Sequence, residues 1–199
     1  MLSLINPEDS GQVRIGFPKR IPVLARHLII CRMPDAKTTR SIRLADQFEA
    51  AQESFIRVVE SLTVEHWRMR GKNTPELRIN NEDESRAVGV IAHHVAVNQD
   101  WIMSRIKAII DDKPTPPVDF TEINARHANE HAHATRGEVL ALLRESKPRL
   151  GKEIRAIPDD QLDKERQLPS GTMSVQQRIE RVLIGHMKSH QASIEATIA

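Results

Sequence analysis

The chain has 199 residues and a formal net charge of +2, with 39% hydrophobic residues, 3% aromatic residues and no tyrosine. This length suffices for one domain with its own core, and the composition excludes a disordered or membrane-embedded chain. With so few aromatic residues, Ala, Leu, Ile and Val must fill the core, which suits helix-on-helix packing. Residues 1–40 carry a net +4 and the remainder −2, so the main body is not a polyanion-binding surface.

Residues 1–40 show no helical period and contain five Gly or Pro residues from Gly11 onward. We predict an irregular basic N-terminal extension. A second hypothesis is that natural translation starts at Met33, so that residues 1–32 are not native. Aromatic residues do not alternate with the basic ones, so this segment does not predict nucleic-acid binding.

The only cysteine, Cys31, lies in this extension, so neither an intrachain disulfide nor a cysteine zinc site is expected. Arg26 and His27 interrupt its apolar stretch, which makes a poor signal-peptide core. No run approaches the ~18 apolar residues of a transmembrane helix. The sequence therefore predicts a cytoplasmic protein without membrane contact.

The first predicted helix covers residues 41–60, where apolar residues recur at steps of three and four. Thr63–Trp67 is predicted as a short turn with an aromatic anchor, and residues 70–83 as a polar loop. The second predicted helix begins near Glu84 and Ser85 and ends at about Asp111. The prolines that follow cannot continue a helix.

The third predicted helix runs from about Thr121 to Glu145. Pro148 is expected to kink or interrupt it, and a further helical stretch is expected from Leu150 to Ile157. Residues 168–171 are predicted as a loop, and the fourth helix runs from Thr172 or Ser174 almost to the end. No convincing β-alternation appears, so residues 41–199 are predicted to form one all-α domain, an antiparallel four-helix bundle.

The fourth predicted helix carries a pair of histidines on its apolar face. His186 and His190 are four residues apart, so they lie side by side, about 40° apart around the helix. Val175, Ile179 and Leu183 share that face. Burying an unpartnered imidazole costs a few kcal/mol, so two neighbouring ones require an explanation. Core histidines hydrogen-bonded to the backbone or to each other are one explanation, and a metal site is the other.

His94 of the second predicted helix adds a third candidate ligand. It shares a face with Ile91, Asn98 and Trp101, whereas the adjacent His93 is expected on the polar flank. Three neutral imidazoles with an open fourth position suit Zn, Ni or Fe(II). His94, His186 and His190 are therefore our predicted metal ligands, if the two helices converge.

A competing group lies on the third predicted helix. His127 and His131 are four residues apart, and His133 follows. Their face is mixed in polarity and offset from the apolar stripe. We interpret these histidines as rim or solvent residues; the alternative is that they line a pocket and bind substrate.

Two segments carry a resemblance to a known family. Val90-Ile-Ala-His-His-Val-Ala-Val-Asn98 and Val182-Leu-Ile-Gly-His-Met-Lys-Ser-His190 are similar to the histidine motifs of the DinB/YfiT-like superfamily. The opening Asp46-Gln-Phe-Glu and the later Leu62-Thr-Val-Glu-His-Trp67 are also similar. The resemblance covers about residues 41–199. Asn98 departs from it, because many relatives have an acidic residue there.

The resemblance implies a four-helix bundle with a divalent metal ion held by His94, His186 and His190. It also implies a transferase or isomerase that uses a low-molecular-weight thiol, such as mycothiol or bacillithiol, on a small electrophile. In such an enzyme Asn98 would hydrogen-bond a group that coordinates the metal ion. Trp101 would form one wall of the cofactor pocket, and His131 would be the general base. A homodimer is compatible with the resemblance. The alternative is a non-catalytic, metal-stabilised stress-response or binding module.

Overall fold

The computed structural model describes residues 39–72, 86–168 and 171–199. The predicted N-terminal extension, most of the loop predicted at 70–83 and the start predicted at Glu84 and Ser85 lie outside the described residues. The described part is predominantly helical, as the sequence predicts. Its helices and strands, in chain order, are α1 (Arg40–Ser61), α2 (Val64–Arg68), α4 (Val88–Ile110), α5 (Phe120–Glu130), α6 (Arg136–Arg155), η1 (Gln161–Asp163), β1 (Glu165–Leu168), β2 (Gly171–Ser174), α7 (Val175–Arg178), η2 (Ile179–Ile184) and α8 (Gly185–Ile198).

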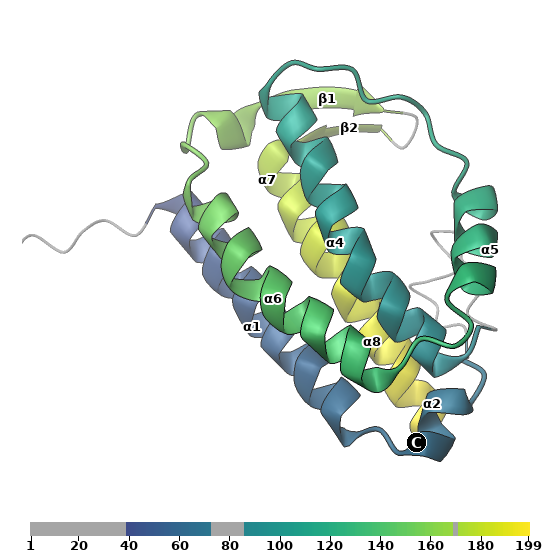
Figure 1. Ribbon diagram of the computed structural model, residues 1–199. Coiled ribbons are helices and arrows are strands. Elements are labelled where there is room, and N and C mark those ends of the chain that lie inside the picture. Colours follow the sequence, from purple (N-terminus) through teal and green to yellow (C-terminus); the bar gives the residue numbers. More distant parts are fainter. Residues whose placement is uncertain (1–38, 73–85, 169–170) are drawn as a thin grey trace, which may run out of the picture. The chain divides into compact units, whose positions relative to one another are not determined.

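The long helices pack around a common interior (Figure 1). α1 contacts α6 and α8, and α4 contacts the same two helices from the other side. α7, η2 and α8 follow one another as a single rod. α5 stands apart on the outer side of α4 (Figure 1). The core is therefore enclosed by α1, α4, α6 and the α7–η2–α8 rod.

Aliphatic residues fill most of this core, as the low aromatic content requires. α1 contributes Phe48 and Phe55, both fully buried, from the stripe that the sequence predicts. α6 contributes Leu143 and Leu150, and the C-terminal rod contributes Ile194 among others, all of them fully buried. Burial of these side chains is the main stabilising contribution to the fold.

Side-chain hydroxyl or carboxylate groups cap the starts of five of the described helices, among them α2, where the Thr63 hydroxyl accepts a hydrogen bond from the His66 backbone. Thr39 accepts a hydrogen bond from the Ile42 backbone at the start of α1, and Asp119 accepts one from the Glu122 backbone at the start of α5. Thr135 with Glu138, and Ser174 with Gln177, form reciprocal capping boxes at α6 and α7. These caps satisfy backbone donors that the first turn of a helix leaves unpaired.

The prediction of one helix from Thr121 to Glu145 is wrong. The chain leaves the helical conformation after Glu130 and starts α6 at Arg136. The cause is local, because Thr135 and Glu138 cap the start of α6 in the Thr-x-x-Glu pattern that favours a helix N-terminus. Because the chain turns here, α5 runs in a different direction from α6 and lies on the outer side of α4 (Figure 1).

The structure also corrects the expected interruption at Pro148 and the expectation that the domain has no β-strands. α6 continues through Pro148 to Arg155 without interruption, because residues on both sides of the proline are held by packing in the core. Residues 165–174 contain an antiparallel hairpin, in which Glu165 pairs with Ser174 and Leu168 with Gly171. Four-residue strands are too short for a period-two pattern to be recognised in the sequence. Among the described residues, no helix has the length and apolar character that crossing a bilayer requires.

Candidate metal centre

His94, His186 and His190 come together in the interior between α4 and α8. His94 and His190 are buried, with exposed fractions of 2% and 0%, and His186 is half-buried. The i,i+4 spacing on α8 puts His186 and His190 on one side of that helix. Contact between α4 and α8 brings His94 opposite them. The convergence on which the sequence prediction depended is therefore present.

The three rings present the same type of atom to one another. The Nε2 atom of His186 lies 3.1 Å from Nε2 of His94 and 3.0 Å from Nε2 of His190. One nitrogen from each of the three rings lies within 4.8 Å of the others. For a tetrahedral zinc site with Zn–N bonds of 2.0–2.1 Å, ligand nitrogens lie about 3.3 Å apart. The spacing thus suits three ligands of one ion.

Hydrogen bonds alone account poorly for this arrangement. A neutral imidazole nitrogen is either one donor or one acceptor. His186 Nε2 has two nitrogen neighbours at hydrogen-bond distance, so a single proton or a single lone pair must serve both contacts. One cation at the centre would use the lone pair of every ring. The chemistry of the donor set therefore fits a divalent transition metal.

The electrostatic surroundings keep the His94 ring in the neutral form that binds metals. Burial lowers the pKa of His94 well below its ordinary value of 6.5, and the neighbouring His186 and His190 lower it further. A neutral ring keeps its lone pair available. His94 is thus a ready ligand near neutral pH without first losing a proton.

Asn98 lies beside His94 on the next turn of α4. Its amide nitrogen is 3.0 Å from Nδ1 and 2.9 Å from Nε2 of His94. The amide is therefore next to the ring nitrogens of His94, one of which faces His186. Trp101 is further from the three histidines: its ring packs edge-on against Phe120 of α5, and the Arg105 guanidinium lies over it.

The helix that carries His186 is distorted just before the ligand. η2 (Ile179–Ile184) is π-helical and leads directly into Gly185 and His186. A π-helical segment inserts an extra residue into a turn and rotates all that follows, and such segments are frequent at functional sites. The spacing of the apolar stripe in the sequence gave no sign of it.

The prediction that His93 points to a polar flank is wrong. His93 is 7% exposed, and its ring faces His127 of α5 and His131, the residue that follows α5. Burial lowers the pKa of His93, and it lowers the pKa of His127 to about 4. His127 and His131 are half-buried and His133 is exposed. The interpretation of all three as rim or solvent residues therefore holds in full only for His133.

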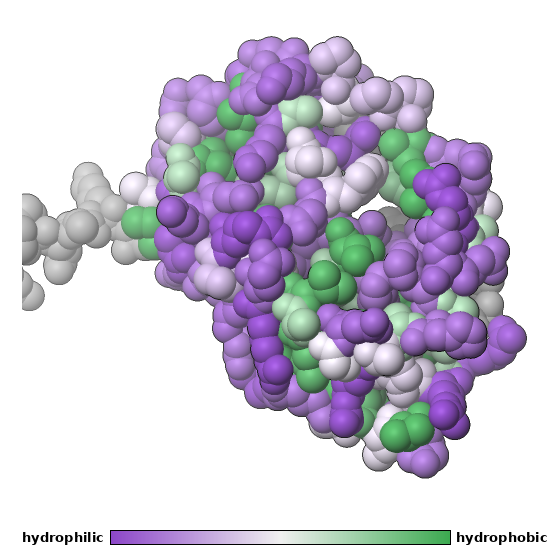
Figure 2. Space-filling model, in the orientation of Figure 1, coloured by the Kyte–Doolittle hydropathy of each residue, from purple (hydrophilic) through white to green (hydrophobic). Residues whose placement is uncertain are grey.

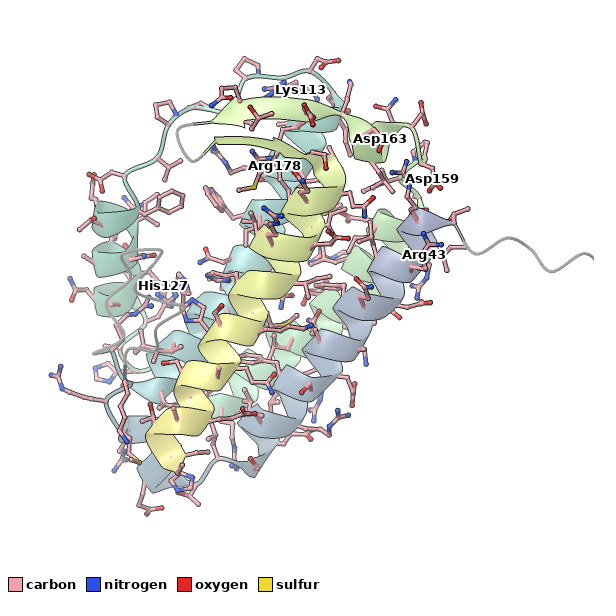
Figure 3. The ribbon with its side chains drawn as sticks, turned by 180° about the vertical axis from the view of Figure 1, so that it is seen from behind. Arg43, Lys113, His127, Asp159, Asp163 and Arg178 are labelled. Carbon is pink, nitrogen blue, oxygen red and sulfur yellow. The ribbon has the colours of Figure 1, made fainter. Side chains whose placement is uncertain are left out.

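His131, the predicted general base, therefore belongs to this neighbouring group and not to the set around His94. The helical period of the chain cannot reveal this, because His93 is covered by His127 and His131, which lie more than 30 positions away in the sequence. Figure 3 shows His127 on α5 directed toward the interior of the molecule.

Open space lies beside α4 in two places. The face of the molecule in Figure 2 is hollowed between α4 and α5. A separate cavity of about 510 Å³ lies beside α2 and the turn between α5 and α6, and its lining includes Trp67, Gly89, Val90 and His133. That volume is within the range of small-molecule sites. Gly89 and Val90 lie one turn before His93 and His94 on α4, although none of the three predicted ligands lines this cavity.

The chain matches the DinB superfamily over residues 47–194, and it belongs to that superfamily. The matched range includes most of α1, the whole of α4, α5 and α6, and all three predicted ligands. No curated protein and no solved structure matches the chain.

Proposed function

We propose that this protein is a metal-dependent enzyme that uses a low-molecular-weight thiol on a small electrophile. In this proposal the long helices form the antiparallel four-helix bundle that the sequence predicts, and the active site lies between α4 and α8. The single observation that carries the proposal is the convergence of His94, His186 and His190, with Nε2 atoms 3.0 and 3.1 Å apart.

His94, His186 and His190 would hold the divalent ion. When bound, such an ion favours the thiolate form of a thiol, because it stabilises the negative charge on sulfur. In the reaction the thiol loses its proton, sulfur forms a bond to the electrophilic carbon, and the leaving group departs with its electron pair. The described part of the chain contains no cysteine, so the nucleophile in this proposal comes from the cofactor.

Neighbouring residues would bind and orient the reactants. Asn98, in contact with His94, is placed to hydrogen-bond a group at the ion. Trp101 of α4 and Phe120 of α5 form an apolar contact between these two helices. These side chains would exclude water from the electrophile while leaving one side of the ion accessible.

Metal content is the first test. We would purify the wild type, a His186→Ala/His190→Ala double variant and a His133→Ala control, all without an affinity tag, and measure bound metals by elemental mass spectrometry. The double variant is expected to lose about one zinc, nickel or iron ion per chain relative to the wild type. The control changes an exposed histidine and should lose none. Equal metal content in the wild type and the double variant would overturn the proposal.

Thiol binding is the second test. Mycothiol, bacillithiol and glutathione would each be titrated into the metal-loaded wild type by calorimetry, with the double variant as the control. We expect at least one thiol to bind the wild type and not the variant. If metal is bound and none of the thiols binds, the alternative function, a non-catalytic metal-stabilised module, replaces the enzyme.

A further inference from the structure

α5 has an unusual attachment to the rest of the domain. None of its eleven residues is buried, so it lacks the apolar face by which a surface helix ordinarily docks. Phe120 touches Trp101, but Phe120 itself is 57% exposed. Among the described residues, the remaining ring contacts from α5 and the residue that follows it are made by histidines. His127 and His131 lie against His93 and, in part, His94 of α4.

These histidines form a second compact group of nitrogen donors. His93 Nδ1 lies 2.9 Å from His127 Nε2. The ring centroids of His93 and His131 are 4.1 Å apart, and those of His127 and His131 are 4.9 Å apart. One nitrogen from each of the three rings lies within 4.8 Å of the other two. The i,i+4 spacing of His127 and His131 repeats the arrangement of His186 and His190.

The protein groups around this cluster leave its hydrogen-bonding incomplete. His127 Nδ1 is buried and has no hydrogen-bond partner among the residues that the structure describes. No ion pair joins these three histidines to a carboxylate in the part of the chain that the structure describes. The nearby Glu138 is engaged by the backbone and hydroxyl of Thr135 in the α6 cap. The group thus consists of imidazoles that face one another, and the Glu138 carboxylate acts on His93 and His131 only at a distance, without an ion pair to either in the described part of the chain.

The two groups adjoin because His93 and His94 are consecutive on α4. Their rings diverge, one toward α5 and one toward α8. His94 nevertheless remains close to the second group, since its ring centroid is 5.5 Å from that of His127, with the planes at 74°. Each group takes one ligand from α4 and an i,i+4 pair from elsewhere in the chain. That parallel construction is difficult to attribute to ordinary core packing.

We propose that His93, His127 and His131 form a second site for a divalent metal ion, beside the site of His94, His186 and His190. Three imidazoles suit zinc and other borderline ions better than magnesium or calcium, which prefer oxygen ligands. The second ion would also tether α5 to α4, which explains how a helix without buried residues keeps its place. While the ion is bound, His131 uses its lone pair as a ligand and does not serve as the general base.

Zinc stoichiometry tests this site separately from the first. Metal-free wild type, a His127→Ala/His131→Ala double variant, the His186→Ala/His190→Ala double variant and the His133→Ala control would be loaded with zinc, desalted and analysed. About two zinc ions per chain are expected for the wild type and the control, and about one for each double variant. His133→Ala is the matched control, because His133 lies in the same segment but points to solvent.

Hydrogen exchange of α5 provides a readout that does not depend on catalysis. Zinc should slow exchange across Phe120–Glu130 at least several-fold in the wild type and in the His186→Ala/His190→Ala variant. It should leave exchange there unchanged in the His127→Ala/His131→Ala variant. If that variant is poorly folded, the milder His127→Gln variant, which keeps a polar side chain of similar size, takes its place.

The outcomes separate this proposal from the proposed function. One ion per chain in the wild type, unaffected by the His127 and His131 substitutions, overturns the second site and leaves the first intact. One ion that is lost only with His127 and His131 supports the second site and overturns the first. Two ions in the wild type with no effect of zinc on α5 overturn the tether.

Discussion

The interior of this protein contains two kinds of buried polar region. On the side where α1 and α6 meet α4, Gln52 donates to the Leu143 carbonyl at 2.7 Å and to the Ser146 hydroxyl at 2.9 Å. Ser146 in turn donates to Gln99 Oε1 at 3.0 Å. On the side where α8 and α5 meet α4, imidazole nitrogens face imidazole nitrogens. The first region pairs donors with acceptors, whereas the second gathers groups of one kind.

The difference indicates what each region is for. A hydrogen-bonded network such as that of Gln52, Ser146 and Gln99 pairs donors with acceptors within the protein, except at Gln52 Oε1, which has no partner among the described residues. The network fixes how three helices pack. A cluster of neutral imidazoles is completed by something that accepts several lone pairs at once, and a metal ion does so. We therefore expect the network to respond to mutation but not to metals, and the histidine groups to respond to both.

The largest expected effect separates the two regions by metal alone. Zinc at a thousandfold excess over its dissociation constant should stabilise the wild type by about 4 kcal/mol, which corresponds to roughly 10 °C in Tm for a domain of this size. A variant with Ala at His127, His131, His186 and His190 should show no such gain, and Ser146→Ala should keep it. Thermal unfolding followed by circular dichroism, with and without zinc, measures the gain. A full gain in the four-histidine variant would contradict the comparison.

The next effect concerns the hydrogen-bonded region. Ser146→Ala removes the donor to Gln99 Oε1 and one of the two acceptors of the Gln52 amide, which keeps the Leu143 carbonyl. It should lower the free energy of unfolding by about 1–3 kcal/mol. Urea denaturation of the metal-free protein measures this change. The zinc content of the variant should equal that of the wild type. A loss of zinc in this variant would mean that the two regions are not independent.

A glycine near the histidines sharpens the comparison further. A Cβ at Gly89 would lie 2.3 Å from Nε1 of Trp67, the atom that donates to the Ala134 carbonyl at 2.9 Å in the turn after α5. Gly89→Ala should therefore displace the indole and lower stability by about 1–2 kcal/mol, despite the better helix propensity of Ala.

Hydrogen exchange around Ala134 should also rise in Gly89→Ala. Gly137→Ala is the control, because nothing lies within 4 Å of a Cβ there. It should raise stability slightly, by up to about 1 kcal/mol. Equal effects of the two substitutions would show that Trp67 does not hold the turn.

The smallest effect lies at the surface where α1 meets α6. Arg155 donates to both carboxylate oxygens of Glu49, at 2.5 and 2.8 Å, and these hydrogen bonds lower the pKa of Glu49 below 4.5. A lowered pKa in the folded state stabilises the protein above the unfolded value, and this contribution is lost as pH falls through the folded value. Glu49→Gln should cost about 0.5 kcal/mol at pH 7. Urea titrations at pH 7 and pH 3 should show the difference disappearing in acid, with no change in zinc content.

The sequence by itself determined the helical character of the domain and the composition of the first histidine group. His186 and His190 share a face because four residues make about one helical turn, and His94 shares its face with apolar residues for the same reason. These are properties of local periodicity. The Thr135–Glu138 cap is also a local signal, and it would have predicted the break between α5 and α6.

Only the tertiary structure decided what covers each face. His93 is on the polar flank of α4 by local arithmetic, yet it is buried because α5 turns back against it. Packing between distant segments also accounts for three other features. These are the second histidine group, the π-helical segment before His186 and the continuation of α6 through Pro148. Burial is set by contacts between segments distant in the chain, and packing energy overrides the preference of a single residue.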